Sequence, residues 1–305
     1  MKTCYLHLGM PKTGSTSIQK AFHDFRDGDI RYAELDESNH GLPLISAFSE
    51  KPEAFYILRN RGMGAAAAGE LGAAYREQIT AIAESDGDVI FSSEAVPDHM
   101  RPKDIAGMIA FFQARAEAVK VILYARPVAS LVSSQFQENI KHGAAAFKLP
   151  APKYRKRFET VVNAAGRENV TFVRFAREDL VGGDIVQDFA HRIGVATPPH
   201  GVVGNESLSV DAVGRIYLFN KVMAPHLPAK QQVNVRNTLK KRLVDLGGPK
   251  FMLHPDLIRQ HIADHRDDIE WAEETCGFDL AGDVNLTVSD GLVAGEADLL
   301  RFISR

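Results

Sequence analysis

A loop near the N-terminus carries the residues best suited to binding an anion. It reads GMPKTGST at residues 9–16, between an apolar run at residues 3–8 and a helical pattern that begins at Ser15. Glycines let such a loop turn tightly, so that its backbone N–H groups and the positive N-terminus of the next helix converge on one group of anionic oxygens. The sequence therefore predicts a phosphate-type loop between the first strand and the first helix.

The position of the lysine separates this loop from that of nucleoside triphosphate enzymes. Their loop, G-x4-G-K-[ST], has lysine where this chain has Ser15, and the nearby cation here is Lys12. In those enzymes the late lysine contacts the β- and γ-phosphates, and an Asp at a strand end supports Mg²⁺. Neither DVIFSSE at residues 88–94 nor VILYARP at residues 121–127 ends in such an Asp. The loop is therefore expected to bind a shorter anion, without a metal.

The segment HLGMPKTGSTSIQ at residues 7–19 resembles the 5′-phosphosulfate loop of sulfotransferases, in their bacterial branch. These enzymes use 3′-phosphoadenosine 5′-phosphosulfate (PAPS) as donor and release 3′,5′-phosphoadenosine (PAP). The resemblance implies that Lys12 reaches the oxygen that bridges phosphate and sulfate. It also implies a set of residues that hold the 5′-phosphate through backbone N–H groups and hydroxyls: Thr13, Gly14, Ser15 and Thr16, with Pro11 in the same loop.

A second anion site is expected after the apolar run at residues 120–125. Arg126 ends that run, and an arginine at the carboxyl edge of a parallel sheet offers a fork for a phosphate. By the same resemblance, Arg126 and Ser134, eight residues further on, hold the 3′-phosphate. Ser130 and Ser133 are alternatives to Ser134. In the structural alternative, Arg126 forms a salt bridge at a helix start and Ser134 is a solvated helical serine.

Transfer to a hydroxyl or an amine also requires a base close to the acceptor. Glu94, in FSSEAV, follows a strand that is expected beside the first one, and the resemblance supports a Ser-Ser-Glu at this place. Glu94 could instead be a helix-start carboxylate or orient Lys12. His40, in ESNHGL on a predicted loop, is the second candidate, and its alternative is an exposed loop histidine without function.

Strand-length apolar runs alternate with helical patterns over the first 194 residues. Strands are expected at residues 3–8, 30–33, 88–92, 120–125 and 169–175. Helices are expected at residues 15–25, 64–84, 102–118, 127–142, 153–165 and 183–193. This alternation predicts an α/β fold with a parallel sheet covered on both faces. Together with the resemblance, which covers about residues 1–220, it predicts a three-layer P-loop-like fold.

After residue 194 the chain becomes rich in Pro and Gly and then shows helical patterns only, at residues 210–223, 229–246 and 255–275. Residues 1–194 are thus expected to form the core that binds the nucleotide donor. Residues 195–305 are expected to be a helical segment that packs on this core and shapes the acceptor site. NESLS, at residues 205–209, resembles a segment that follows the core in the sulfotransferase family.

Composition narrows the class of protein and its surroundings. With 305 residues, 45% hydrophobic and 25% charged, the chain is typical of a soluble globular protein. A net charge of −3 gives no general attraction to nucleic acid or to an anionic membrane. The sequence has no run long enough for a membrane helix and no signal-peptide core, and Cys4 and Cys276 are the only cysteines. We therefore expect a cytoplasmic protein.

The leading hypothesis is a sulfotransferase that acts on a small-molecule or carbohydrate acceptor without metal. One alternative is a P-loop nucleotide kinase or NTPase with a rearranged loop, and another is a catalytically silent nucleotide-binding module. His261 and His265 lie four residues apart, but two histidines do not make a metal site, and a solvated helix face is expected. The sequence does not indicate the acceptor or the oligomeric state.

Overall fold

The computed structural model describes residues 1–201, 207–282 and 292–304 and divides into two compact units. The first unit comprises Met1–Arg126, Lys153–Val202 and Thr275–Phe278. The second comprises Pro127–Pro152, Val203–Glu274 and Asp279–Arg305. Residues 127–152, which the sequence grouped with the core, thus belong with the later helices. Two residues of the NESLS segment, 205 and 206, lie outside the described residues.

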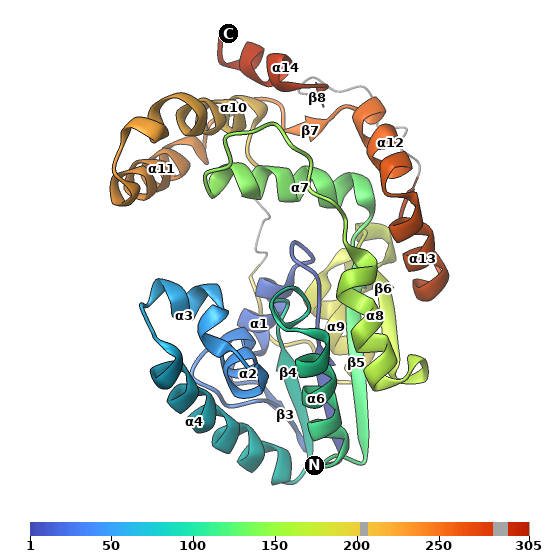
Figure 1. The fold of residues 1–305 in the computed structure, drawn as a ribbon. Helices are drawn as coiled ribbons and strands as arrows, with labels where there is room; N and C mark the ends of the chain where they lie inside the picture. The colour runs from blue at the N-terminus through green and yellow to red at the C-terminus, as the bar shows by residue number, and fades with distance from the viewer. Residues whose placement is uncertain (202–206, 283–291, 305) are drawn as a thin grey trace. The chain divides into compact units, whose positions relative to one another are not determined.

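The first unit is built on a six-stranded sheet of order β2-β3-β4-β1-β5-β6 (Figure 1). Its strands are β1 (Thr3–His7), β2 (Arg26–Asp27), β3 (Ile30–Tyr32), β4 (Asp88–Ser92), β5 (Ala118–Ala125) and β6 (Val170–Arg174). Only the short edge pair β2–β3 is antiparallel among these strands. Leu6 of β1 lies opposite Phe91 of β4 and Val121 of β5, so the predicted place of the strand before Glu94 beside the first strand is confirmed. The α/β prediction with a central parallel sheet is confirmed as well.

Helices cover both faces of this sheet because neighbouring residues of each strand point to opposite sides. Tyr5, Ile90 and Ile122 pack with α1 and α9, whereas Phe91 contacts Phe112 of α6 at 4.9 Å between ring centroids. The helices of this unit are α1 (Ser15–Phe22), α2 (Gly41–Phe48), α3 (Tyr56–Asn60), α4 (Ala65–Glu84), α5 (Val96–His99), α6 (Pro102–Gln113), α8 (Tyr154–Ala165) and α9 (Ile185–Ile193).

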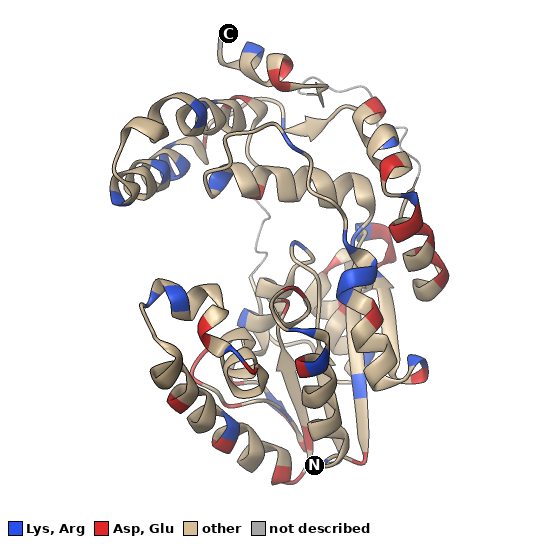
Figure 2. Ribbon diagram, in the orientation of Figure 1, with Lys and Arg blue, Asp and Glu red and all other residues tan. Residues whose placement is uncertain are grey.

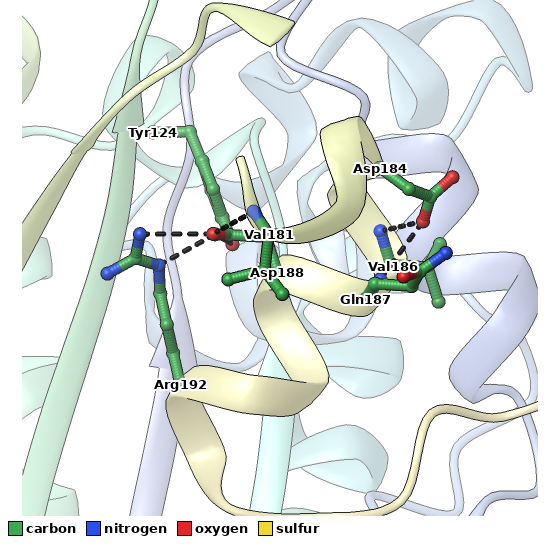
Figure 3. Close-up of polar contacts among 7 residues, drawn as sticks. All are labelled: Tyr124, Val181, Asp184, Val186, Gln187, Asp188 and Arg192. Carbon is green, nitrogen blue, oxygen red and sulfur yellow. Dashed lines mark hydrogen bonds and ion pairs between the residues drawn. The ribbon is translucent and has the colours of Figure 1, made fainter. Parts of the chain in front are cut away.

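A buried carboxylate ties α9 to the sheet (Figure 3). Asp188 is fully buried, and its Oδ2 accepts hydrogen bonds from the Tyr124 hydroxyl of β5 at 2.8 Å and from Arg192 Nε at 2.6 Å. Its Oδ1 accepts from Arg192 Nη2 at 3.0 Å and from the Val181 N–H at 3.1 Å. We call these four residues the Asp188 cluster. Both oxygens are satisfied, as a buried charge requires.

The same helix begins with a carboxylate cap, also drawn in Figure 3. Asp184 Oδ1 accepts hydrogen bonds from the N–H groups of Val186 at 2.9 Å and Gln187 at 3.0 Å. These N–H groups have no partner within the helix, so the cap satisfies them and fixes where α9 starts. Gly194, with φ of 75°, ends the helix in the left-handed conformation that favours glycine.

The second unit is mainly helical, with α7 (Val128–Lys141), α10 (Val210–Leu218), the π-helix η5 (Phe219–Met223), α11 (Ala229–Leu243), α12 (Pro255–Asp264), most of α13 (Arg266–Cys276) and α14 (Glu296–Arg301). It also contains two short parallel strands, β7 (Met252–Leu253) and β8 (Leu292–Val293). The prediction of helices only after residue 194 was therefore wrong in this respect, because neither two-residue strand has a periodic pattern.

The histidine pair of the second unit is not a solvated face. His261 on α12 is buried, and its Nε2 lies 3.0 Å from the carbonyl oxygen of Pro150. The predicted single helix at residues 255–275 is divided at His265 into α12 and α13. Over the part of the chain that the structure describes, no cluster of three or more His, Cys, Asp or Glu is arranged to hold a metal. Among the same residues, no helix is both long and apolar enough to cross a membrane.

Candidate active site

The phosphate-type loop connects β1 to α1 and is curled by two left-handed residues. Gly14 has φ of 75° and Lys12 has φ of 69°, a conformation that side chains other than glycine rarely adopt. Thr13 is fully buried, and its Oγ1 donates to the Met10 carbonyl at 2.7 Å, which closes the turn. Within the described ranges, no side chain caps the N-terminus of α1, which starts at Ser15. The first N–H groups of that helix therefore face the loop, where they can bind an anion.

Buried polar atoms without partners surround Gly9. His7 Nε2 and Ser15 Oγ are buried and have no hydrogen-bond partner among the described residues. A Cβ at Gly9 would lie 3.1 Å from His7 Nε2, 3.2 Å from Ser15 Oγ and 3.4 Å from Thr13 Oγ1. We call these four residues the Gly9 cluster. A side chain at position 9 would therefore crowd these polar atoms, and the unpartnered hydroxyl of Ser15 is a group that a bound oxyanion could satisfy.

The other loop residues differ in exposure. Pro11 and Lys12 are half-buried, and Thr16 is exposed on the first turn of α1. The loop can therefore offer the Lys12 ammonium and the Thr16 hydroxyl to a ligand in solution. The Ser15 hydroxyl, in contrast, is buried within the fold.

Arg126 follows β5 and reaches the loop. Its Nη1 donates to the Lys12 carbonyl at 2.5 Å, and its N–H points at Met10 Sδ at 3.3 Å. Its own carbonyl accepts from the Tyr154 hydroxyl at 2.5 Å. Burial lowers the pKa of the guanidinium to about 10, so it remains charged at neutral pH. The structure thus brings two predicted cations, Lys12 and Arg126, to the same loop.

Ser134 belongs to the second unit. It is half-buried on α7, in the second unit, as are Ser130 and Ser133. The Ser130 hydroxyl donates to the Pro127 carbonyl at 3.1 Å, within one turn of α7. The pairing of Arg126 with Ser134 around a 3′-phosphate stays a prediction.

Glu94 is half-buried just past β4 and is held by two side-chain amides. Gln19 Nε2 of α1 donates to Oε2 at 2.7 Å, and Asn39 Nδ2 lies 3.3 Å from Oε1. Asn39 is itself fixed, because its Oδ1 accepts from the Gly41 N–H at 2.8 Å. Within the described residues no cation forms an ion pair with Glu94, so the carboxylate is oriented by neutral donors.

The prediction of an exposed loop position for His40 was wrong. His40 is fully buried directly before α2, and its Nδ1 accepts from the Ser92 N–H at 3.2 Å. Burial lowers its pKa to about 3. An imidazole with so low a pKa has little affinity for a proton at neutral pH, so Glu94 is the candidate base that the geometry favours.

Sequence reasoning missed three residues of this site: His7, Gln19 and Asn39. Gln19 is four residues after Ser15, so it lies on the same face of α1 and is 2% exposed. That spacing could have indicated a residue facing the site. The Nδ1 of His7 lies 2.8 Å from Ser92 Oγ, a contact that depends on the register of β1 and β4.

Comparison with known proteins gives few matches. No family model matches this chain, and no curated protein matches it. A crystal structure of a sulfotransferase from Alicyclobacillus acidocaldarius is similar with a TM-score of 0.41 and 13% identity, over 92% of this chain and 98% of that one. A sulfotransferase domain from the curacin biosynthetic pathway has a TM-score of 0.34 and 16% identity, over 65% of this chain and 75% of that one. We therefore base the function on this chain's own residues.

Proposed function

We propose that this protein is a sulfotransferase that moves the sulfuryl group of PAPS to a hydroxyl acceptor. The observation that carries the proposal is the buried Ser15 hydroxyl, which has no partner among the described residues at the uncapped start of α1. An unsatisfied buried hydroxyl is costly in a native protein unless a ligand completes its hydrogen bonds. A 5′-phosphate would do so.

The cations fit a phosphosulfate better than a triphosphate. Lys12 precedes Gly14, so its ammonium starts from the entrance of the loop and not from the first turn of α1, where the lysine of triphosphate loops stands. At the entrance it can reach the bridging oxygen beyond the 5′-phosphate. Arg126 adds a second positive charge beside the same loop.

The transfer step follows from these positions. The acceptor oxygen forms a bond to sulfur while the bond from sulfur to the bridging phosphate oxygen breaks. That oxygen leaves with the bonding electron pair as part of PAP, and the acceptor proton passes to the Glu94 carboxylate. Charge grows on the leaving oxygen during the step, so a cation aimed there stabilises the transition state more than the ground state.

Calorimetry tests the donor assignment directly. We expect PAP to bind at least about tenfold more tightly than ADP or ADP with Mg²⁺, a difference of about 1.4 kcal/mol. Tighter binding of ADP with Mg²⁺ would favour the kinase or NTPase alternative. Binding of PAP without turnover of PAPS over a wide acceptor panel would favour a silent nucleotide-binding module.

A further inference from the structure

An exposed aromatic surface lies on α3 and α5 of the first unit. Tyr56 is 45% exposed, the most exposed aromatic among the large hydrophobic residues that the structure describes. Its ring centroid lies 5.3 Å from that of His99, which is also exposed, and 4.9 Å from that of Phe55. Phe55 is 4% exposed and forms the floor beneath the other two. We call these three residues the Tyr56 platform.

The platform is next to the candidate base. Ala95 follows Glu94 and caps α5, and the His99 N–H donates to the Ala95 carbonyl at 3.0 Å, so one helical turn joins base and platform. Burial, followed by the Glu94 carboxylate, raises the pKa of the Tyr56 hydroxyl, which is consistent with a short separation.

An ion pair holds α5 in place. Arg157 Nε of α8 donates to Asp98 Oδ1 at 2.8 Å, and its Nη2 donates to Oδ2 at 3.2 Å. The Arg157 side chain is 4% exposed, so this two-bonded contact is sheltered from water. Because Asp98 precedes His99, the contact fixes the edge of the platform relative to Glu94.

We propose that the Tyr56 platform is the acceptor subsite and that it takes a sugar ring. This inference rests on the proposed function. A sugar ring has an apolar C–H face that can lie on an exposed aromatic side chain, and hydroxyls at its edge that bond to polar groups such as Asn39 and Glu94. A phenol or a fatty alcohol needs an apolar enclosure on most sides, which a 45% exposed tyrosine does not provide.

Labelled PAPS and an acceptor panel test the inference on the full chain. The saccharide arms are lactose, N,N′-diacetylchitobiose, a longer chitin oligosaccharide and octyl glucoside, which separate free sugars, glycan chains and lipid-linked sugars. The other arms are 2-naphthol and 1-octanol. We expect a sulfated product from at least one saccharide arm and none from the other two.

Variants of Tyr56 test whether the saccharide acceptor binds at the Tyr56 platform. We expect Tyr56→Ala to raise the KM for the saccharide about tenfold while the affinity for PAP changes less than twofold, and Tyr56→Phe to behave like the parent. Val181→Ala, at the 40% exposed Val181 of the same unit, is the matched control and should leave the KM unchanged.

Each outcome decides one of the two proposals. Sulfation of 2-naphthol or 1-octanol with the saccharides inert would overturn the sugar assignment, as would an unchanged KM in Tyr56→Ala. Binding of PAP with no acceptor used in any arm would also count against it and leave the donor assignment standing. Absence of PAP binding would overturn the proposed function itself, and the acceptor inference with it.

Discussion

Two buried polar clusters of the first unit differ in whether the fold supplies hydrogen-bond partners for all of their polar atoms. In the Asp188 cluster, each carboxylate oxygen accepts at least two hydrogen bonds, from Tyr124, Arg192 or Val181. In the Gly9 cluster, His7 Nε2 and Ser15 Oγ remain without a partner among the described residues. The fold thus supplies every partner of the Asp188 carboxylate, whereas the Gly9 cluster leaves two atoms whose hydrogen bonds a ligand could complete.

The unpartnered atoms of the Gly9 cluster lower the stability of the native state, and the Asp188 cluster has no such penalty. A buried polar group without a hydrogen bond destabilises the native state by about 1–3 kcal/mol. Substitutions should therefore act differently in the two places. In the Asp188 cluster they should lower stability and leave donor binding intact, and at the loop they should lower binding or turnover and leave stability intact.

The largest effect is expected from Asp188→Ala. Removing the carboxylate leaves the buried Tyr124 hydroxyl without its acceptor and the partly exposed Arg192 without its ion pair, so the free energy of unfolding should fall by about 3 kcal/mol. Urea denaturation measures this change. Asp29→Ala is the control: the Asp29 side chain is 80% exposed and pairs with Lys2 at the surface, so the change should stay within about 0.5 kcal/mol. A loss below about 1 kcal/mol for Asp188→Ala would contradict the structural role.

Lys12→Ala should lower the rate of sulfuryl transfer about 10²–10³-fold. Alanine keeps a Cβ on the left-handed backbone, so the variant removes the ammonium without relaxing the loop. Steady-state kinetics with PAPS provides the measurement, and Lys20→Ala, at an exposed lysine of α1, is the matched control. Full turnover in Lys12→Ala would exclude the assigned role.

The stability of the first unit should depend on pH because this unit buries two histidines, His7 of the Gly9 cluster and His40. Burial lowers the pKa of His7 and of His40 to about 3, against 6.5 in the unfolded chain. Below about pH 6.5 the unfolded state binds protons that the native state does not, so the free energy of unfolding falls as the pH falls from 6.5 toward 3. Each histidine should contribute about 1.4 kcal/mol per pH unit in that window.

Urea midpoints measured between pH 7.5 and 4.5 check this pH dependence, with His7→Gln as the comparison. Glutamine cannot take up a proton, so the slope in this variant should be smaller by the contribution of one histidine. An unchanged slope would mean that His7 does not titrate as its burial requires.

The smallest effect is expected from Ser15→Ala. The affinity for PAP should fall about tenfold because one hydrogen bond to the phosphate is lost, which corresponds to about 1.4 kcal/mol. The free energy of unfolding should not fall, because the hydroxyl that is removed has no partner among the residues that the structure describes. Calorimetry and urea denaturation on one preparation measure both, and Ser17→Ala is the control on the same helix. If Ser15→Ala lowered the free energy of unfolding and left the affinity for PAP unchanged, Ser15 would have a structural role like that of Asp188 and not a role in binding.

Much of the fold follows from sequence periodicity. The strand at residues 88–92 was predicted with the bounds of β4, because a short apolar run between polar residues has few other conformations. α2 was missed because GLPLISAF is buried over six successive residues, from Gly41 to Ser46, and shows no apolar stripe. α1 was predicted to residue 25 but ends at Phe22, since Asp24 takes φ of 62° and turns the chain toward β2.

The site was only partly predictable, for a physical reason. Lys12 and Ser15 lie within one loop, so their spacing in the sequence carries the prediction. Gln19 and Glu94 are 75 residues apart, and they meet because β1 and β4 pair with His7 opposite Ser92. Such a contact depends on strand register, which a single sequence does not specify. The burial of His40 likewise depends on Tyr32, whose ring lies 4.4 Å away.

The left-handed backbone at Lys12 lowers the stability of the native state, while the side chain at this position has the role that we propose in sulfuryl transfer. A side chain at φ of 69° costs about 1–2 kcal/mol, which glycine would recover. A library screened only for survival at high temperature should therefore enrich Lys12→Gly and yield robust but inactive proteins. Because we propose that the Lys12 ammonium acts in the transfer step, engineering for thermostability should leave residue 12 untouched.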